Sequence, residues 1–87
     1  MAAQGYLALG RMTPSRMAWL EKLEREGPCH WDGHGRTRAD CIRLGWSEVV
    51  RNDEGHTVLD AFARRKEWIT DKGREALRVH RQALESE

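Results

Sequence analysis

Residues 42–50 read IRLGWSEVV and predict a change from helix to strand around Gly45. Ile42 and Leu44 precede this glycine, and aromatic and β-branched residues follow it. Glycine readily adopts the left-handed conformation that ends helices, whereas aromatic and β-branched side chains favour strands. We therefore expect a helix from Thr37 to about Leu44, followed by a short strand from Trp46 to Arg51.

The expected helix 37–44 carries its apolar and cationic residues on two different faces. Thr37 is a suitable N-cap, and Asp40 complements the positive end of the helix dipole. The residues expected to face the core are Ala39, Ile42 and, beside them, Cys41. The residues expected to face solvent are Arg36, Arg38 and Arg43.

The chain before this helix predicts an earlier helix with clear ends. Thr13 can cap its N-terminus, and Pro14 suits its first position because no helical N–H bond is lost there. The helix should run to about Glu26, where a Gly-Pro pair ends it. The next stretch, CHWDGHG at 29–35, is rich in turn residues and leaves room only for a short extended piece. The core stripe expected on the earlier helix is Met17, Leu20 and Leu23.

The chain after the first strand contains a turn, a second strand and a last helix. NDEG at 52–55 is a strong turn signal, and EWIT at 67–70 suits a strand that could pair with the first one. Between them, TVLDAFARRK at 57–66 fits either a helix or an irregular loop within a wing. Thr70 can cap the closing helix, which should run to about Glu85. The residues expected to share one face of that helix are Leu77, His80 and Leu84.

This order of elements resembles a winged helix-turn-helix, and two strings carry the resemblance. Ile42 to Val50 resembles the end of a recognition helix that runs through glycine into the first wing strand. Trp68 to Leu77, WITDKGREAL, resembles the last wing strand and closing helix of MarR-type regulators. The resemblance implies an α+β fold over residues 12–87, a small winged-helix-like domain of three or four helices with a two- or three-stranded β wing. Residues 1–11 would then be an N-terminal arm. The chain departs from the pattern at 29–35, where the usual helix before the recognition helix is shortened or missing.

The length and composition fit one small domain and leave no room for a separate catalytic domain. The chain has 87 residues, of which 39% are hydrophobic, enough for one modest core. Its 15 Lys and Arg are balanced by 14 Asp and Glu, so the net charge of +1 does not by itself indicate nucleic acid. The mildly apolar residues 1–11 lack the basic flank and the length of a signal peptide or membrane span. We expect a cytoplasmic protein with reduced thiols.

The resemblance implies that the partner is duplex DNA and that the helix 37–44 reads it in the major groove, as in a transcriptional regulator. Arginine can bridge the two major-groove acceptors of guanine, and a hydroxyl can bind a phosphate or a base. The wing would reach a neighbouring phosphate or the minor groove. Regulators of this type often dimerise through terminal helices, which implies a homodimer through the closing helix. The expected contacts are Arg36, Thr37, Arg38 and Arg43 on the helix and Arg64, Arg65 and Lys66 on the wing.

Protein binding is the alternative function, with the same scaffold acting as an adaptor or small inhibitor, including a phage-encoded one. The near-neutral charge and the shortened helix favour it, and so do four tryptophans, because tryptophan is enriched in binding hot spots. The expected interface residues are Trp19, at the edge of the first core stripe, and Trp31, in the polar loop, although either could belong to the core. A DNA binder would gather its arginines on one face without acids between them, whereas a protein binder would expose an apolar patch around one of these tryptophans.

Four potential metal ligands lie close together in the sequence: Cys29, His30, His34 and Cys41. Zinc requires four such groups in a tetrahedron, but this spacing matches no compact pattern of paired cysteines or histidines. We therefore expect no metal or cofactor, with the cysteines acting as small apolar residues and the histidines as loop residues. A catalytic pair could be sought in Cys29 and His30 or in Asp32 and His34, but the chain shows no oxyanion donor set or glycine-rich phosphate cradle. No catalytic residue is expected.

Overall fold

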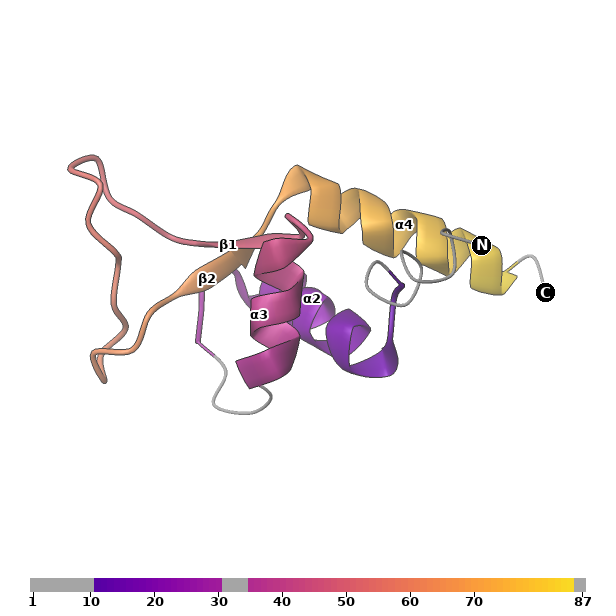
Figure 1. The fold of residues 1–87 in the computed structure, drawn as a ribbon, viewed down its shortest axis with the longest axis horizontal. Helices are drawn as coiled ribbons and strands as arrows, with labels where there is room; N and C mark the ends of the chain where they lie inside the picture. The colour runs from indigo at the N-terminus through magenta and orange to yellow at the C-terminus, as the bar shows by residue number, and fades with distance from the viewer. Residues whose placement is uncertain (1–10, 31–34, 86–87) are drawn as a thin grey trace.

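The structure, a computed structural model, describes residues 11–30 and 35–85. This part of the chain forms three helices, α2 (Pro14–Glu26), α3 (Gly35–Arg43) and α4 (Asp71–Glu85), and two short strands, β1 (Ser47–Val49) and β2 (Glu67–Ile69). The α2 helix packs against α3, α4 and β2, and the long β1–β2 connection projects away from the helices (Figure 1). The fold is a small α+β domain with a two-stranded antiparallel sheet.

The ends of α2 lie where the sequence predicts them. Thr13 is the N-cap, and its side-chain oxygen accepts a hydrogen bond from the backbone N–H of Arg16 at 3.2 Å. Pro14 occupies the first helical position. Gly27 follows the last turn with a φ of 76°, and its N–H donates to the carbonyl of Leu23 at 2.9 Å. Local capping chemistry therefore accounts for both boundaries.

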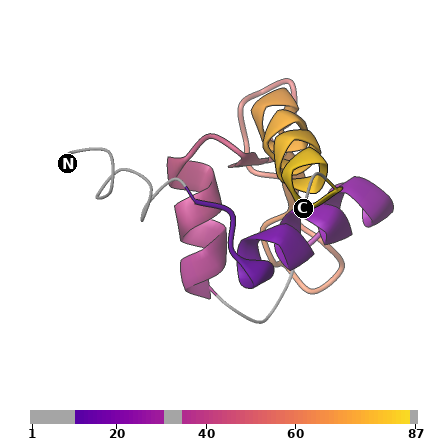
Figure 2. The ribbon, with the colours of Figure 1, turned by 90° about the vertical axis from the view of Figure 1, so that its right-hand side faces the viewer.

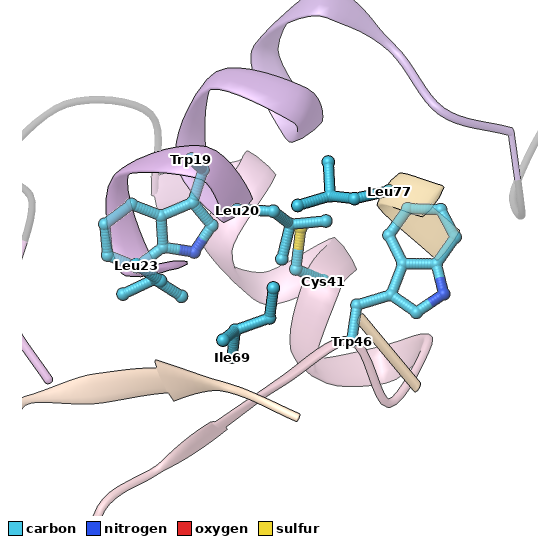
Figure 3. Close-up of a cluster of buried hydrophobic side chains, with 7 residues drawn as sticks. All are labelled: Trp19, Leu20, Leu23, Cys41, Trp46, Ile69 and Leu77. Atoms are coloured by element: carbon cyan, nitrogen blue, oxygen red, sulfur yellow. The ribbon is translucent and has the colours of Figure 1, made fainter. Parts of the chain in front are cut away.

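The core is a single cluster to which the three helices, β2 and Trp46, the residue directly before β1, contribute (Figure 3). On α2 the buried side chains follow helical spacing: Arg16, Trp19, Leu20 and Leu23. Met17, which was predicted to belong to the core stripe, lies at the border of the core and is only half-buried. The prediction that Trp19 is available to a protein partner is wrong, because its side chain is fully buried. The buried hydrophobic residues are Trp19, Leu20, Leu23, Cys41, Trp46, Ile69 and Leu77.

The two strands pair in a register that sets the faces of the sheet. Ser47 is opposite Ile69, Glu48 is opposite Trp68, and Val49 is opposite Glu67. Side chains alternate between the two faces of a strand. Ser47, Glu67 and Ile69 are accordingly buried, while Glu48 and Trp68 are exposed on the outer face. The predicted strands are therefore confirmed, and both are shorter than expected.

An extended segment before α3 borders the second strand. The N–H of Cys29 donates to the carbonyl of Glu67 at 3.0 Å, and the N–H of Glu67 donates back to the carbonyl of Cys29 at 2.8 Å. This antiparallel bridge is the short extended piece predicted after the Gly-Pro pair. Trp31, which was predicted to contact a protein partner, lies outside the described residues, as do residues 1–10 of the expected N-terminal arm.

The α3 helix differs from its prediction in its start and in its orientation. It begins at Gly35, so Thr37 lies inside the first turn and is not the cap. Of its residues only Cys41 is buried, while Ala39 and Ile42 are exposed, contrary to prediction. Arg38 was expected outward, but it is turned toward the sheet. The reason is Glu67, whose nearly inaccessible carboxylate forms an ion pair with Arg38.

The β1–β2 connection contains no helix. Three chain segments meet in it through backbone bonds: Val50 N–H to the Lys66 carbonyl, Val58 N–H to the Val50 carbonyl and Lys66 N–H to the Val58 carbonyl, at 2.9 to 3.1 Å. Two turns extend from this junction. The first lobe, residues 51–57, closes at the bridge of Arg51 with Thr57, and the second lobe, residues 59–65, closes at the bridge of Leu59 with Arg65. Of the two structures predicted for 57–66, the irregular one is confirmed.

The start of α4 follows its prediction. The Thr70 side-chain oxygen accepts from the N–H of Gly73 at 3.0 Å, and Asp71 occupies the first turn. Leu77 is buried in the core and His80 is half-buried, but Leu84 is 50% exposed near the end of the helix. No helix within the described residues is both long enough and apolar enough to cross a membrane.

Candidate nucleic-acid interface

The outward face of α3 carries two exposed arginines. Arg36 lies in its first turn and Arg43 in its last, and the exposed Ala39 lies between them. Residues seven apart on a helix lie on the same side, two turns away from each other. The small side chain of Ala39 leaves the helix backbone open to close approach by a large ligand.

The only acidic residue within α3, Asp40, is directed toward α2. Its Oδ2 accepts from the Arg16 guanidinium at 3.2 Å, and the Arg16 side chain is only 9% exposed. The same guanidinium donates to the carbonyl of Arg11 at 2.6 Å. Arg43 lies 3.5 Å from the other Asp40 oxygen, yet its side chain remains 69% exposed. The exposed charge on this helix is therefore positive.

Arg38 does not belong to this cationic face. Its guanidinium lies 3.0 Å from the Glu67 carboxylate, and the side chains are 17% and 1% exposed. An arginine bound in this way cannot reach a nucleic acid without leaving a buried carboxylate unpaired. Arg38 instead fixes the rotation of α3 about its axis, which is why Arg36 and Arg43 face outward.

The three basic residues in and directly after the second lobe, Arg64, Arg65 and Lys66, differ in their exposure and in their ion pairs. Arg64 binds Asp60 at 3.0 Å, with side chains 34% and 16% exposed, and therefore helps to hold the turn. Arg65 is exposed and Lys66 half-buried, and within the described part of the chain neither is seen in an ion pair. Of the three predicted wing residues, Arg65 and Lys66 are thus the ones available to a phosphate.

The first lobe has the opposite charge. The Asn52 side-chain oxygen accepts from the N–H groups of Glu54 and His56 at 3.0 and 2.9 Å, which confirms the predicted turn. Asp53 and Glu54 are exposed at its tip. Acidic side chains repel phosphates, so the two lobes are not equivalent surfaces.

A partly apolar hollow, which the sequence did not predict, lies next to the cationic face. It has a volume of about 430 Å³ and is lined by Ile42, Glu48, Val49, Arg51 and Trp68. The Trp68 indole N–H donates to Glu48 at 2.8 Å, and its side chain is 42% exposed. Strand alternation places Trp68 on the face opposite Glu67 and Ile69, but the sequence does not show which of the two faces is buried.

A second apolar hollow, of about 440 Å³, lies along α4. Trp46 and Met12 form one side of it, and α4 forms the other with Val79, which is 52% exposed. The α4 residues that line it are Lys72, Glu75, Ala76, Val79, His80 and Ala83.

The cysteines and histidines considered as metal ligands do not come together in the described residues. In residues 11–30 and 35–85, no three His, Cys, Asp or Glu side chains are placed to hold a metal. Both cysteines are free thiols, Cys29 at the β2 edge and Cys41 in the core. His30 instead lies beside the second lobe, with its Nδ1 3.1 Å from the Arg65 carbonyl. His34 lies outside the described residues.

Cys41 is expected to react with thiol reagents only when the protein unfolds. Burial raises the pKa of Cys41 to about 12, and burial also raises the pKa of Cys29. The thiolate is the nucleophile, so a buried thiol with a high pKa is inert. In a Cys29→Ser variant at pH 8, the remaining thiol should be modified at the rate of unfolding and quickly in denaturant. Modification at the rate of a free peptide thiol would contradict the burial of Cys41.

Comparison of the chain with models of protein families, with curated proteins and with solved structures found no match.

Proposed function

We propose that the chain is a winged-helix DNA-binding protein that inserts α3 into the major groove and uses the β1–β2 connection as its wing. The order of α2, α3, β1, β2 and α4 supports this proposal, together with the resemblance in the sequence. The observation that carries it is the outward face of α3. Its exposed charges are the arginines Arg36 and Arg43, while its one acid is directed toward Arg16.

The dimensions of α3 suit a short contact with the groove. At about 1.5 Å of rise per residue, the backbones of Arg36 and Arg43 are roughly 10 Å apart, the length of about three base pairs. A helix fits the major groove, where arginine can bind guanine O6 and N7 and an apolar side chain can touch a thymine methyl group. Arg36 and Arg43 would make the first kind of contact at a preferred site and bind phosphates on a duplex of mixed sequence, and Ala39 and Ile42 would make the second kind.

The remaining contacts are revised by the ion pairs of the structure. Arg65 and Lys66 would bind phosphates from the wing. Arg38 and Arg64 would support the interface indirectly, since each is bound to a carboxylate of the protein and is much less exposed than Arg43, which keeps 69% of its side chain exposed beside Asp40. A role as a transcriptional regulator belongs to the same proposal, which is a binding function without a catalytic step. A homodimer through α4 stays a prediction, with the hollow around Val79 as the surface that suits it.

Replacing both outward arginines is expected to abolish most of the DNA affinity. In a fluorescence-anisotropy titration of a mixed-sequence 20-base-pair duplex at low salt, R36A/R43A should bind at least about tenfold more weakly than the wild type, because two charged contacts are lost. The matched control is R74A/R78A. It removes the same charge from the exposed side of α4, where the two arginines bind Asp71 and Glu75. Equal weakening by both pairs would contradict a specific role of α3.

Protein binding remains the second candidate because the hollow formed by Ile42, Val49 and Trp68 exposes apolar surface. Its place differs from the sequence prediction, since Trp19 is in the core. A wild-type protein that binds no duplex even at low salt would favour this second function. The adaptor or inhibitor role would then be sought at Trp68.

A further inference from the structure

The turn at the end of the second lobe is held by one carboxylate. Asp60 Oδ1 accepts from the N–H of Phe62 at 2.8 Å and from the N–H of Arg64 at 3.0 Å, and Oδ2 accepts from the Arg64 side chain at 3.0 Å. The Asp60 backbone also bonds in both directions, with its N–H to the Arg64 carbonyl and its carbonyl to the N–H of Ala63. Hydrogen bonds from the Arg64 and Phe62 backbones lower the pKa of Asp60, so the carboxylate is charged at neutral pH. The turn is therefore preorganised.

The backbone of this turn includes a strained residue. Ala63 has a φ of 60°, and within the described residues it is the only one other than glycine with a positive φ. The left-handed conformation is unfavourable for a residue with a Cβ atom, and it persists only where surrounding bonds impose it. Such residues are concentrated at binding sites and other functional positions.

The side chain that this turn presents is Phe62. It is the only phenylalanine of the chain, and it is 77% exposed. The Arg64 guanidinium lies over its ring, 5.1 Å from the ring centre. Burying a large aromatic side chain stabilises a protein. A phenylalanine held in water on a fixed turn does not contribute this stabilisation to the free protein.

The charge around the turn favours nucleic acid as the surface that Phe62 meets. Arg65 and Lys66 follow directly along the chain, the acid of this turn, Asp60, is paired with Arg64, and the exposed acids Asp53 and Glu54 belong to the other lobe. Figures 1 and 2 share a vertical direction, and in both the second lobe lies at the lower edge of the molecule, as does the N-terminal end of α3. In Figure 1 the two are separated along the long axis of the molecule, so a duplex held by α3 would have to extend along that axis to meet the second lobe.

We propose that Phe62 is an apolar wedge that inserts between stacked base pairs from the minor groove of duplex DNA held by α3. Apolar side chains that enter the minor groove unstack base steps and bend the duplex. Asp60 would keep the aromatic side chain extended toward the DNA, and Arg65 would bind the phosphate beside the opened step. The proposal rests on the DNA-binding function proposed above, and it adds a residue and a mode of contact to it.

The single phenylalanine allows a direct test. Protein grown with 4-fluorophenylalanine carries one fluorine, at Phe62, and its ¹⁹F signal in the free protein should show the solvent isotope shift of an exposed ring. On saturation with a mixed-sequence duplex containing flexible TA steps, the signal should move and lose most of that isotope shift. An unchanged ¹⁹F signal in a complex that anisotropy shows to be saturated would overturn the wedge and leave the DNA-binding function standing.

Substitution gives the second measurement. F62A should bind the same duplex about tenfold more weakly, the effect of losing one stacked base contact, with the same dependence on salt as the wild type. Circular dichroism and thermal unfolding should be unchanged, since the side chain is exposed in the free protein. Wild-type affinity in F62A would overturn the proposal. Absence of wild-type binding by anisotropy at low salt would instead overturn the DNA-binding function, and the wedge with it.

Discussion

Replacing Gly73 with alanine is expected to lower the free energy of unfolding by roughly 3 kcal/mol, the upper end of the usual range for an overpacked core. An ideal Cβ on Gly73 would lie 2.1 Å from the Trp46 carbonyl oxygen and 2.8 Å from Ile69 Cγ1. The carbonyl cannot move away freely, because it accepts the N–H of Thr70 at 3.0 Å where β2 leads into α4. The first turn of α4 would have to shift from the sheet.

Urea denaturation of G73A and the wild type measures this effect, with Gly35→Ala as the matched control. A Cβ on Gly35 would meet only the end of the Arg38 side chain, at an ordinary 3.7 Å. Alanine is also the better helix former, so G35A should be neutral or slightly stabilising. A G73A variant as stable as G35A would show that α4 does not approach Trp46 so closely.

Breaking the ion pair between Arg38 and Glu67 is expected to have an effect of similar size. Removing one partner of a buried pair typically costs about 3 to 5 kcal/mol, because the other charge stays buried without compensation. In R38L the Glu67 carboxylate, 1% exposed, would lose the guanidinium 3.0 Å away. The second Glu67 oxygen, Oε1, has no hydrogen-bond partner among the described residues, so nothing there compensates for the loss.

The double variant R38L/E67L separates the charge from the packing. Replacing both members of a buried pair with apolar residues is often neutral or stabilising. Denaturant unfolding should therefore show R38L strongly destabilised and R38L/E67L largely restored. If R38L alone has wild-type stability, Arg38 does not hold α3 against the sheet, and the outward placement of Arg36 and Arg43 would lose its explanation.

The parts of the fold that follow from local chemistry could be predicted from the sequence. The ends of α2 depend on Thr13, Pro14 and Gly27, and the start of α4 on Thr70, all of which act within a few residues. The positions of the two strands were also predictable, because β-branched and aromatic residues mark β1 and β2. These features need no knowledge of distant contacts.

The orientation of α3 could not be predicted in the same way. Its apolar residues Ala39 and Ile42 suggested an inner face, but the helix is turned by an ion pair with Glu67, a residue 29 positions from Arg38 in the sequence. In a sequence, a strand glutamate that is buried in an ion pair cannot be distinguished from an exposed one unless its partner is known. The candidate site changed accordingly, with Arg38 leaving it and Ile42 joining its border.

The β1–β2 connection was the least predictable segment. Its structure depends on three backbone bonds that join Val50, Val58 and Lys66, and residues of this kind carry no signal for such a junction. The role of Arg64 was obscured for the same reason, since only the folded turn brings its side chain to Asp60 and Phe62. A basic run in a sequence does not show which of its members are already bound.

The salt dependence of DNA binding measures whether the outward face of α3 binds phosphates and bases as proposed. Each phosphate contact contributes a slope of about −0.9 to the plot of log K against log salt concentration. We expect salt-dependent binding of a mixed-sequence duplex by the wild type, an unchanged slope for R74A/R78A, and a slope shallower by about 1 to 2 for R36A/R43A. Binding that is absent at low salt, or the same slope in all three proteins, would contradict the proposal.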